Sequence, residues 1–510
     1  MRSFGVAVVS LVTAAVAGCS VIAGLGDFED APTTGAGGST GGGGSSGTGG
    51  GTGGSTGGAG GTGGVGGAIE QPPADYSVSF GSTGLDRMGG VDTDAAGNLY
   101  IAGTHHSTIT IASEHPSTLN NPFVAQLDAF LAPAWSASFD VTASAIVHDV
   151  ATGDAGKTTF AGEIQSDVDF GGGLLQPLGR DAYAARFMGN GTHHFSSLWG
   201  NSFAQIVYTV DNSNAGFVIG GVFQGQITFD GNPGVVMVAN GLDGFIASFD
   251  SANNFLWAQQ LTDTNVAQPG GQEVRALCVH NGAQRVYVTG IHDQSAIFDG
   301  LQLAHTGNGS YDGYVLSLNL VDGTLVDHAT YTDEADIVPR DIAYGSTDVV
   351  IVGSFDGGLD VGGTATSLTT AGGPDGFVAA LSSTLVGQWA NRYGGSDQDY
   401  ARSVAIDDQD DMAVVGNFAG TVDFGQGPRT ASNLDAFVMK LSDTGNHVWS
   451  GTYGGAGNDL ALAVAIDTSP RNIIVAGEFA TAIDFGQGVL SSEGSSDLFV
   501  VKFPPFLAQD

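Results

Sequence analysis

One short sequence unit occurs seven times, and this repeat limits the possible folds more than any other feature. In six copies an Asp, any residue and then Phe or Tyr open an alternating apolar stretch, and the earliest copy, NPFVAQL, has Asn121 in place of the Asp. The aromatic residues recur at nearly even intervals: Phe123, Tyr183, Phe245, Tyr314, Phe377, Phe437 and Phe499. A Gly that ends an apolar stretch repeats in the same register: Gly103, Gly162, Gly221, Gly290, Gly353, Gly416 and Gly477. Two markers in one register establish an internal repeat.

Each copy contains short stretches that alternate apolar with polar or small residues, separated by Gly, Asp and Asn. This pattern is typical of β-strands, and no stretch after residue 68 keeps a helical period. The sequence therefore predicts an all-β fold, a seven-bladed β-propeller with four-stranded blades. The seventh copy lacks an outer strand, and the segment YSVSFG at residues 76–81 resembles one. We expect this N-terminal strand to complete the last blade, because that removes an open sheet edge.

Composition excludes several classes of protein. The chain has 510 residues with 14 Lys and Arg against 52 Asp and Glu, a formal net charge of −38. Binding to a phosphate backbone needs clustered bases, so we expect no nucleic-acid partner. Global disorder is excluded by a hydrophobic content of 42%. The chain has two cysteines, Cys19 and Cys278, which excludes a disulfide scaffold.

The segment at residues 1–19, MRSFGVAVVSLVTAAVAGC, has the features of an export signal. A single Arg precedes an apolar stretch from Phe4 to Val16, which is too short to span a bilayer comfortably. The residues VAGC that follow resemble the lipobox of bacterial lipoproteins, which implies a lipid on Cys19 after cleavage. Ser20 carries no Asp-type retention signal, so we expect a lipid-anchored envelope protein at the outer membrane or cell surface. An uncleaved membrane anchor is the alternative.

A glycine-rich segment separates this signal from the repeats. Most positions at 35–67 are Gly and the rest are Ser, Thr, Ala and one Val, with no charge and no aromatic side chain. Such a segment cannot offset its ordering entropy and is predicted to be a disordered tether. The predicted organisation is a lipoprotein signal peptide at 1–18, a lipid-anchored flexible linker at 19–67 and the propeller at 68–510.

Two segments of the repeat are similar to a known family. YGGSDQDYARSVAID (393–407) and YGGAGNDLALAVAID (453–467) resemble the bacterial β-propeller repeat often called SBBP, as does FGSTGLDRMGGVDTD (80–94) more loosely. The resemblance covers roughly residues 76–506 and is strongest in the last two copies. It implies a propeller of secreted or surface-attached bacterial proteins. It implies no shared catalytic residues, so it bears on fold and location rather than on chemistry.

Acidic residues recur before the inner strands and are the candidate metal ligands. Asp86, Asp399 and Asp459 each follow an outer-strand aromatic by six residues. Such carboxylates could line the channel and hold Ca²⁺, or they could form Asx turns that lead into the inner strand. We expect no other cofactor. The Asp of the Asp-x-aromatic unit is expected to cap the loop before the third strand, and the tryptophans are expected to pack in or near the outer strands.

The sequence places a ligand on the face built from long connections. About six residues after each repeated Gly comes an apolar-acidic-apolar triplet, clearest as VDF at Val168 and Val422 and as IDF at Ile483. We interpret these connections as long loops. The fourth copy adds a further insertion, Asp263 to Glu273. Binding residues concentrate on loops held by a rigid scaffold, so this insertion is the favoured ligand site, with a neutral insertion as the alternative.

No nucleophile elbow, HExxH or phosphate-binding loop is present in the sequence. We therefore expect a non-enzymatic envelope lipoprotein, a monomer, whose propeller presents a face to a protein or glycan. The alternatives are a propeller enzyme acting on polysaccharide, as a lyase or glycosidase, and an envelope-assembly scaffold. An enzyme would need non-repeated polar residues that converge on the channel.

Overall fold

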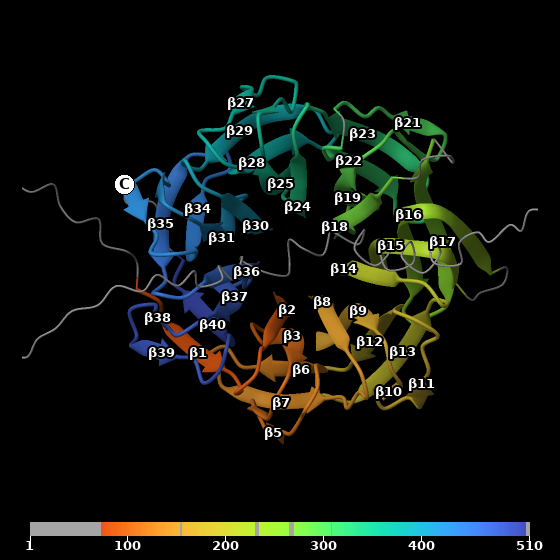
Figure 1. The fold of residues 1–510 in the computed structure, drawn as a ribbon, viewed down its shortest axis with the longest axis vertical. Coiled ribbons are helices and arrows are strands. Elements are labelled where there is room, and N and C mark those ends of the chain that lie inside the picture. The colour runs from red at the N-terminus through yellow and green to blue at the C-terminus, as the bar shows by residue number, and fades with distance from the viewer. Residues whose placement is uncertain (1–72, 154–155, 230–233, 265–269, 308, 506–510) are drawn as a thin grey trace, which may run out of the picture. The chain divides into compact units, whose positions relative to one another are not determined.

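A computed structural model describes residues 73–153, 156–229, 234–264, 270–307 and 309–505. These residues form seven antiparallel sheets arranged around a centre, as the sequence predicted (Figure 1). The innermost strands are β2 (Arg87–Thr93), β8 (Ala145–Thr152), β14 (Gln205–Ser213), β18 (Gln272–His280), β24 (Ile337–Tyr344), β30 (Asp399–Ile406) and β36 (Asp459–Ile466). The second strands are β3 (Leu99–His105), β9 (Thr158–Ile164), β15 (Gly216–Phe229), β19 (Arg285–His292), β25 (Asp348–Phe355), β31 (Met412–Phe418) and β37 (Ile473–Phe479).

The third strands begin with the Asp-x-aromatic unit in most of the copies, and the outer strands follow them. The third strands are β6 (Asn121–Leu127), β12 (Asp181–Phe187), β16 (Val235–Asp250), β22 (Asp312–Asn319), β28 (Asp375–Ser382), β34 (Asp435–Leu441) and β40 (Asp497–Phe503). The outer strands are β7 (Pro133–Ser138), β13 (His193–Trp199), β17 (Phe255–Asp263), β23 (Leu325–Tyr331), β29 (Gly387–Tyr393), β35 (His447–Tyr453) and β1 (Tyr76–Phe80).

The N-terminal strand closes the ring, which confirms the predicted completion of the last blade. Strand β1 pairs antiparallel with β40 along its full length, from Tyr76 opposite Lys502 to Phe80 opposite Leu498. The seventh blade is therefore β36, β37, β40 and β1. Phe80 is 5% exposed and joins the apolar cluster between the seventh and first blades. Because β1 is the first and β40 the last strand along the chain, the blade cannot form from local contacts alone.

The core lies between blades rather than within one centre. Seven clusters of buried apolar side chains are found among the described residues, and each joins two neighbouring sheets. All five tryptophans lie on outer strands: Trp135, Trp199, Trp257, Trp389 and Trp449. The indole N–H of Trp257 donates to the Leu320 carbonyl of the next blade at 2.9 Å. These positions confirm their predicted packing role.

The two repeated markers of the sequence meet in the structure. Each marker Gly of a second strand lies directly opposite the marker aromatic of the third strand, as Gly416 lies opposite Phe437. A Cβ on Gly416 would lie 2.8 Å from Phe437 Cε1 and would overlap the carbonyl oxygen of Tyr400 on the inner strand. The missing side chain therefore lets a buried aromatic ring and a bent inner strand approach the same point.

The apolar-acidic-apolar triplets are not open loops, which corrects the sequence interpretation. Six short hairpins lie in the connections between second and third strands: β4 (Ile109–Thr110) with β5 (Glu114–His115), β10 (Val168–Asp169) with β11 (Leu174–Leu175), β20 (Ala296–Phe298) with β21 (Leu301–Leu303), β26 (Gly358–Leu359) with β27 (Leu368–Thr369), β32 (Thr421–Asp423) with β33 (Pro428–Thr430), and β38 (Ala482–Asp484) with β39 (Val489–Ser491). The apolar residues of the clearest triplets are buried, as Val422 and Phe424 show at 1% exposure each. These residues extend the core, while other hairpin residues such as Thr421 and Asp423 are exposed.

The third blade departs from the four-stranded pattern. Strands β15 and β16 continue pairing beyond the usual length, from Gln226 opposite Val238 to Phe229 opposite Val235. The β20–β21 hairpin of the fourth blade then pairs with the end of β17, which makes a six-stranded sheet. The fourth blade is thereby attached to the third by backbone hydrogen bonds as well as by side-chain packing.

The predicted signal, the lipidation residue Cys19 and the glycine-rich linker lie outside the described residues. Within the described ranges, no helix has the length and apolar character needed to cross a bilayer.

Ring closure by β1 predicts different costs for two substitutions on that strand. Phe80→Ala should destabilise the protein by roughly 3–5 kcal/mol, because it opens a cavity between the last and first blades. Tyr76→Ala should cost under about 1 kcal/mol, because Tyr76 is 39% exposed. Denaturant unfolding followed by tryptophan fluorescence measures both. Equal costs for the two variants would contradict the observed register.

Candidate functional site

A β-bulge occurs at the same place in every inner strand. Pairing with the second strand skips one residue at Gly89, His148, Tyr208, Arg275, Arg340, Arg402 and Leu462. Each bulge residue directly follows the residue that pairs with the marker Gly. The repeated glycine and the repeated bulge are therefore two parts of one structural feature. A bulge turns its extra side chain out of the strand's alternation. Figure 1 shows the inner strands around the centre of the ring, so the bulge residues lie on the strands nearest to that centre.

The bulge position recurs in every blade, but its residue varies, with Arg in the fourth, fifth and sixth blades. Five of the seven carry a large polar side chain, and no two adjacent blades from the first to the fourth carry the same residue. Arg87 and Arg180 lie close enough to His148 to affect its pKa. Together with the bulged arginines, these are five of the chain's 14 basic residues. We call Arg87, His148, Arg180, Tyr208, Arg275, Arg340, Arg402 and the carboxylates Glu163, Glu273 and Glu478 the channel ring.

Ion pairs and hydrogen bonds hold the channel ring in place. Arg275 Nη2 lies 3.1 Å from Glu273 Oε2, and both side chains are almost fully buried. Arg180 pairs with the buried Glu163. Glu478 accepts the backbone N–H of Met88, in the neighbouring blade, at 2.9 Å. The ring thus links blades through groups whose desolvation is offset by partners.

Aromatic rings lie between the charged groups. The guanidinium carbons of Arg340 and Arg402 lie 5.1 and 5.5 Å from the centroid of the Tyr400 ring. On the other side of the channel, His148 and Tyr208 contact edge to face, with centroids 5.4 Å apart. Arginine, tyrosine and carboxylate side chains are groups with which proteins bind sugars and carboxylates.

Burial shifts several pKa values in the channel ring. It raises the pKa of Glu478 to about 7, against the opposing effects of the Met88 N–H and of Arg87 and Arg402. It lowers the pKa of His148 to about 3, with help from the nearby arginines, so this imidazole is neutral at pH 7. It also raises the pKa of Tyr208 well above its ordinary range. A carboxyl group with a pKa near 7 can hold or release a proton at physiological pH.

Further along the inner strands, aspartates connect neighbouring blades. Each accepts a backbone N–H from the inner strand of the next blade: Asp92 from Thr152 at 2.6 Å, Asp149 from Val210 at 2.8 Å, Asp211 from Val279 at 2.7 Å and Asp341 from Val404 at 2.9 Å. The innermost edge of each sheet would otherwise leave these donors without a strand partner. The aspartates are therefore structural acceptors.

The three candidate metal ligands lie where the inner strands of the first, sixth and seventh blades begin: Asp86 directly precedes β2, and Asp399 and Asp459 are the first residues of β30 and β36. Each carboxylate accepts the backbone N–H of the residue four positions earlier, at 2.7 Å for Asp86 and Asp399 and 2.8 Å for Asp459. These bonds close the loop that precedes each inner strand, and they differ from an Asx turn, in which the side chain accepts the N–H of a residue two positions later. Burial raises the pKa of Asp86 to about 6 and of Asp399 and Asp459 to about 7. Ca²⁺ binding by these residues stays a prediction.

The Asp of the Asp-x-aromatic unit caps the preceding loop, as expected. Asp375 accepts the backbone N–H of Ala371 at 2.8 Å, and Asp497 accepts that of Glu493 at 2.9 Å. Asp435 also occupies the space that a Cβ on Gly454 would need. The first Gly of the family-like YGG segment is therefore required by the carboxylate packed against it.

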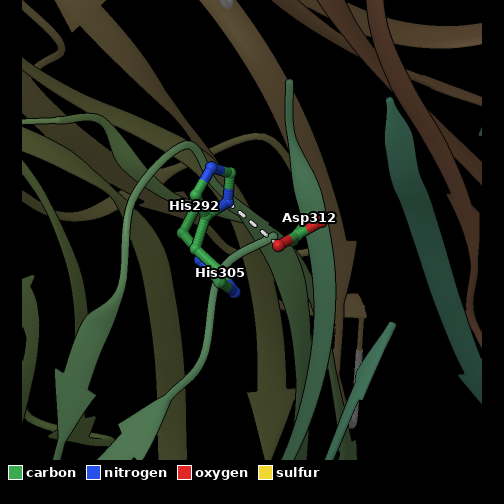
Figure 2. Close-up of side chains that lie close together, drawn as sticks. All are labelled: His292, His305 and Asp312. Carbon is green, nitrogen blue, oxygen red and sulfur yellow. Dashed lines mark ion pairs between the residues drawn. The ribbon is translucent and has the colours of Figure 1, made fainter. Parts of the chain in front are cut away.

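One cluster of potential metal ligands is found among the described residues. One donor atom from each of His292, His305 and Asp312 lies within 4.8 Å of the other two. His292 ends β19, Asp312 lies opposite it at the start of β22, and His305 comes from the connection between them (Figure 2). The sequence analysis missed this site because its three ligands are separated along the chain, on two strands and the connection between them, and match no metal-binding motif. The available signal was His292 at a strand end where four other copies carry Phe: Phe223, Phe355, Phe418 and Phe479.

The inserted segment favoured by the sequence is only partly described. Residues 265–269 lie outside the described residues. At its ends, Gln272 donates to Asp263 Oδ1 at 2.7 Å and Glu273 belongs to the channel ring. Cys278 lies on β18 as a half-buried residue, and desolvation of its thiol raises the pKa.

A second hollow lies at the opposite end of the inner strands. Its volume is about 450 Å³, and its lining includes Asp94, Lys157, Arg186, Asn212 and Asn281. Arg186 is 3% exposed and lies over the rings of Phe195 and Phe217, so it belongs largely to the core. Lys157 is then the lining cation that a ligand entering this end would meet first.

Comparisons with known proteins give no family assignment. No protein-family model matches the chain, and no curated protein sequence matches it. Among solved structures, the chain is similar to Sqt1 from Chaetomium thermophilum at 9% identity and a TM-score of 0.40, over 86% of this chain and 100% of that chain. It is also similar to the quinohemoprotein alcohol dehydrogenase from Comamonas testosteroni at 9% identity and a TM-score of 0.35, over 84% of this chain and 76% of that chain. The fold assignment rests on the sheet topology.

The raised pKa of Asp459 predicts a pH-dependent contribution to stability. The folded state holds this proton more tightly than the unfolded state, so its contribution is present at low pH and is lost as pH rises through about 7. Asp459→Asn cannot titrate. The melting-temperature advantage of the wild type over this variant should therefore shrink between pH 5 and pH 8.

Asp322→Asn is the matched control for this measurement. Asp322 is an exposed turn residue whose pKa is lowered by hydrogen bonds from Thr324, so it titrates below the tested range. This variant should follow the wild type at both pH values. A constant difference between wild type and Asp459→Asn would contradict the raised pKa.

Proposed function

We propose that this protein is a non-enzymatic lipoprotein of the bacterial envelope whose propeller binds a carboxylated glycan at the channel ring. The lipobox-like VAGC at Cys19 and the glycine-rich linker support the anchor, and the SBBP-like segments support a surface-attached propeller. These features come from the sequence. The observation that carries the binding proposal is that five of the 14 basic residues belong to one network of neighbouring charged and aromatic side chains, in a chain of net charge −38.

The chemistry of the ring suits an acidic sugar better than a protein partner. Arginines bind carboxylates through parallel N–H donors, and the Tyr400 ring holds the guanidinium groups of Arg340 and Arg402 beside each other. The ring carboxylates can accept hydroxyl hydrogen bonds. The strongly acidic remainder of the propeller would repel a polyanion elsewhere on the surface, so binding would concentrate at the ring.

The glycan proposal predicts an effect confined to the ring. Arg340→Ala and Arg402→Ala should each weaken binding of an oligogalacturonate roughly 10- to 100-fold, since a hydrogen bond to a charged group contributes about 1.5–3 kcal/mol. Isothermal titration of the full chain measures this. Arg471→Ala is the control, because Arg471 is an exposed residue paired with Asp408.

Two results would contradict the proposal. One is the same affinity for a neutral dextran as for oligogalacturonate. The other is loss of binding in Lys157→Ala rather than in the ring variants, which would place the ligand at the opposite end of the inner strands.

The anchor is tested separately. Cys19→Ser should abolish incorporation of labelled fatty acid and release the protein from the membrane fraction, because the thiol that carries the lipid is gone. Cys278→Ser should leave labelling unchanged. Labelling that persists in Cys19→Ser, or membrane association without labelling, would favour the uncleaved-anchor alternative.

A second function, hydrolysis or elimination of polysaccharide, is favoured by one observation. Glu478 has a pKa of about 7 in a ring of non-repeated polar side chains, which is the property of a general acid. Release of reducing ends or of unsaturated products from polygalacturonate, abolished by Glu478→Gln, would establish this function. Unchanged substrate after long incubation would leave the binding proposal as the better account.

A further inference from the structure

His292 is a buried histidine that no protein group fully satisfies. It is completely buried at the end of β19. Its Nδ1 lies 2.8 Å from the Gln294 carbonyl oxygen, so this nitrogen carries the proton and donates it. Nε2 then bears the lone pair, and this atom has no hydrogen-bond partner among the described residues. An unsatisfied buried nitrogen is costly unless something outside the chain binds it.

The first blade provides a comparison at the same register position. His105 ends β3 opposite Asn121, as His292 ends β19 opposite Asp312. Its Nδ1 also lies near a carbonyl two residues later, that of Ser107, at 2.7 Å. Its Nε2, however, is 2.7 Å from Ser138 Oγ. The protein thus satisfies this nitrogen in one blade and leaves it open in the other.

The open nitrogen belongs to a three-residue cluster. His305 Nδ1 lies 2.9 Å from Asp312 Oδ2 but lacks hydrogen-bond alignment with it. The rings of His292 and His305 meet edge to face with centroids 6.0 Å apart. Asp312 is completely buried and is held by the backbone N–H of Thr306 at 2.7 Å. Figure 2 shows the three side chains converging.

We propose that His292, His305 and Asp312 bind a Zn²⁺ ion. Two imidazoles and a carboxylate are ligands that zinc prefers, and three protein ligands leave a fourth position for water or another ligand. The Nδ1–H bond of His292 to a backbone carbonyl is the outer contact that typically fixes a zinc-binding imidazole. Ca²⁺ and Mg²⁺ prefer all-oxygen sites and are not expected here. This inference is independent of the glycan proposal.

The repeat itself supplies a variant that separates folding from zinc binding. Four copies carry Phe at the position of His292, each opposite the Asp of the Asp-x-aromatic unit. His292→Phe therefore restores the more common side chain of the repeat and should fold. His305→Ala is a second variant on a connection rather than on a core strand. His105→Phe is the matched control, because it alters the same register position in the first blade.

The full chain, freed of metal by a chelator, is titrated with Zn²⁺ in excess Mg²⁺, which occupies weak carboxylate sites. We expect one Zn²⁺ per chain by elemental analysis, a rise in melting temperature, and visible absorption bands of tetrahedral Co²⁺ when cobalt replaces zinc. His292→Phe and His305→Ala should each weaken binding at least 100-fold. His105→Phe and the exposed-residue variant His328→Ala should bind as the wild type does.

Binding of Zn²⁺ by His292→Phe or His305→Ala with wild-type affinity would overturn the proposal, as would a wild type that retains no zinc after dialysis. If His292→Phe does not fold, His305→Ala decides between these outcomes. If His292→Phe and His305→Ala lose zinc binding but still bind oligogalacturonate, the zinc site is supported and the glycan proposal is unaffected.

Discussion

The close approach of three strands at the repeated glycine is the constraint on which the propeller depends. At Gly416 the absent side chain admits both the Phe437 ring and the bent backbone of Tyr400. The ring fills the layer between blades, and the bend produces the bulge that turns Arg402 out of its strand. One glycine per blade thus joins packing to function, because the contact that buries an aromatic also points a side chain toward the channel.

The repeated core positions stabilise the scaffold, and residues that depart from the repeat are therefore informative about function. Positions that serve the core keep their residue type from blade to blade, as the glycine opposite each aromatic does. Positions that serve a ligand need not. The bulge residues vary from Gly89 to Arg402, and His292 replaces a phenylalanine of the repeat. A buried polar residue in place of an apolar one is costly, so such replacements point to a compensating contact.

Many acidic side chains of this chain form hydrogen bonds within the fold, besides those that contribute charge to the surface. Aspartates cap loops before the third strands, close turns before the inner strands and accept N–H groups across blade boundaries, as Asp375, Asp399 and Asp341 do. Many of the 52 acidic residues are therefore part of the repeat rather than of a binding site. The few basic residues are more informative, since the repeat fixes the bulge position but not its residue, which is Arg in only three of the seven blades.

The sequence by itself determined the blade number, the strand order and closure by residues 76–80, because each follows from periodicity and from the need to pair an edge strand. It also predicted the packing of the tryptophans and the capping by the Asp-x-aromatic unit. The interpretation of the apolar-acidic-apolar triplets as parts of long loops was wrong, because their burial depends on contacts with other blades. Only the tertiary structure brought Arg87 and Arg402 beside Glu478 and set His305 beside His292, because such groups converge through ring closure and register rather than through spacing along the chain.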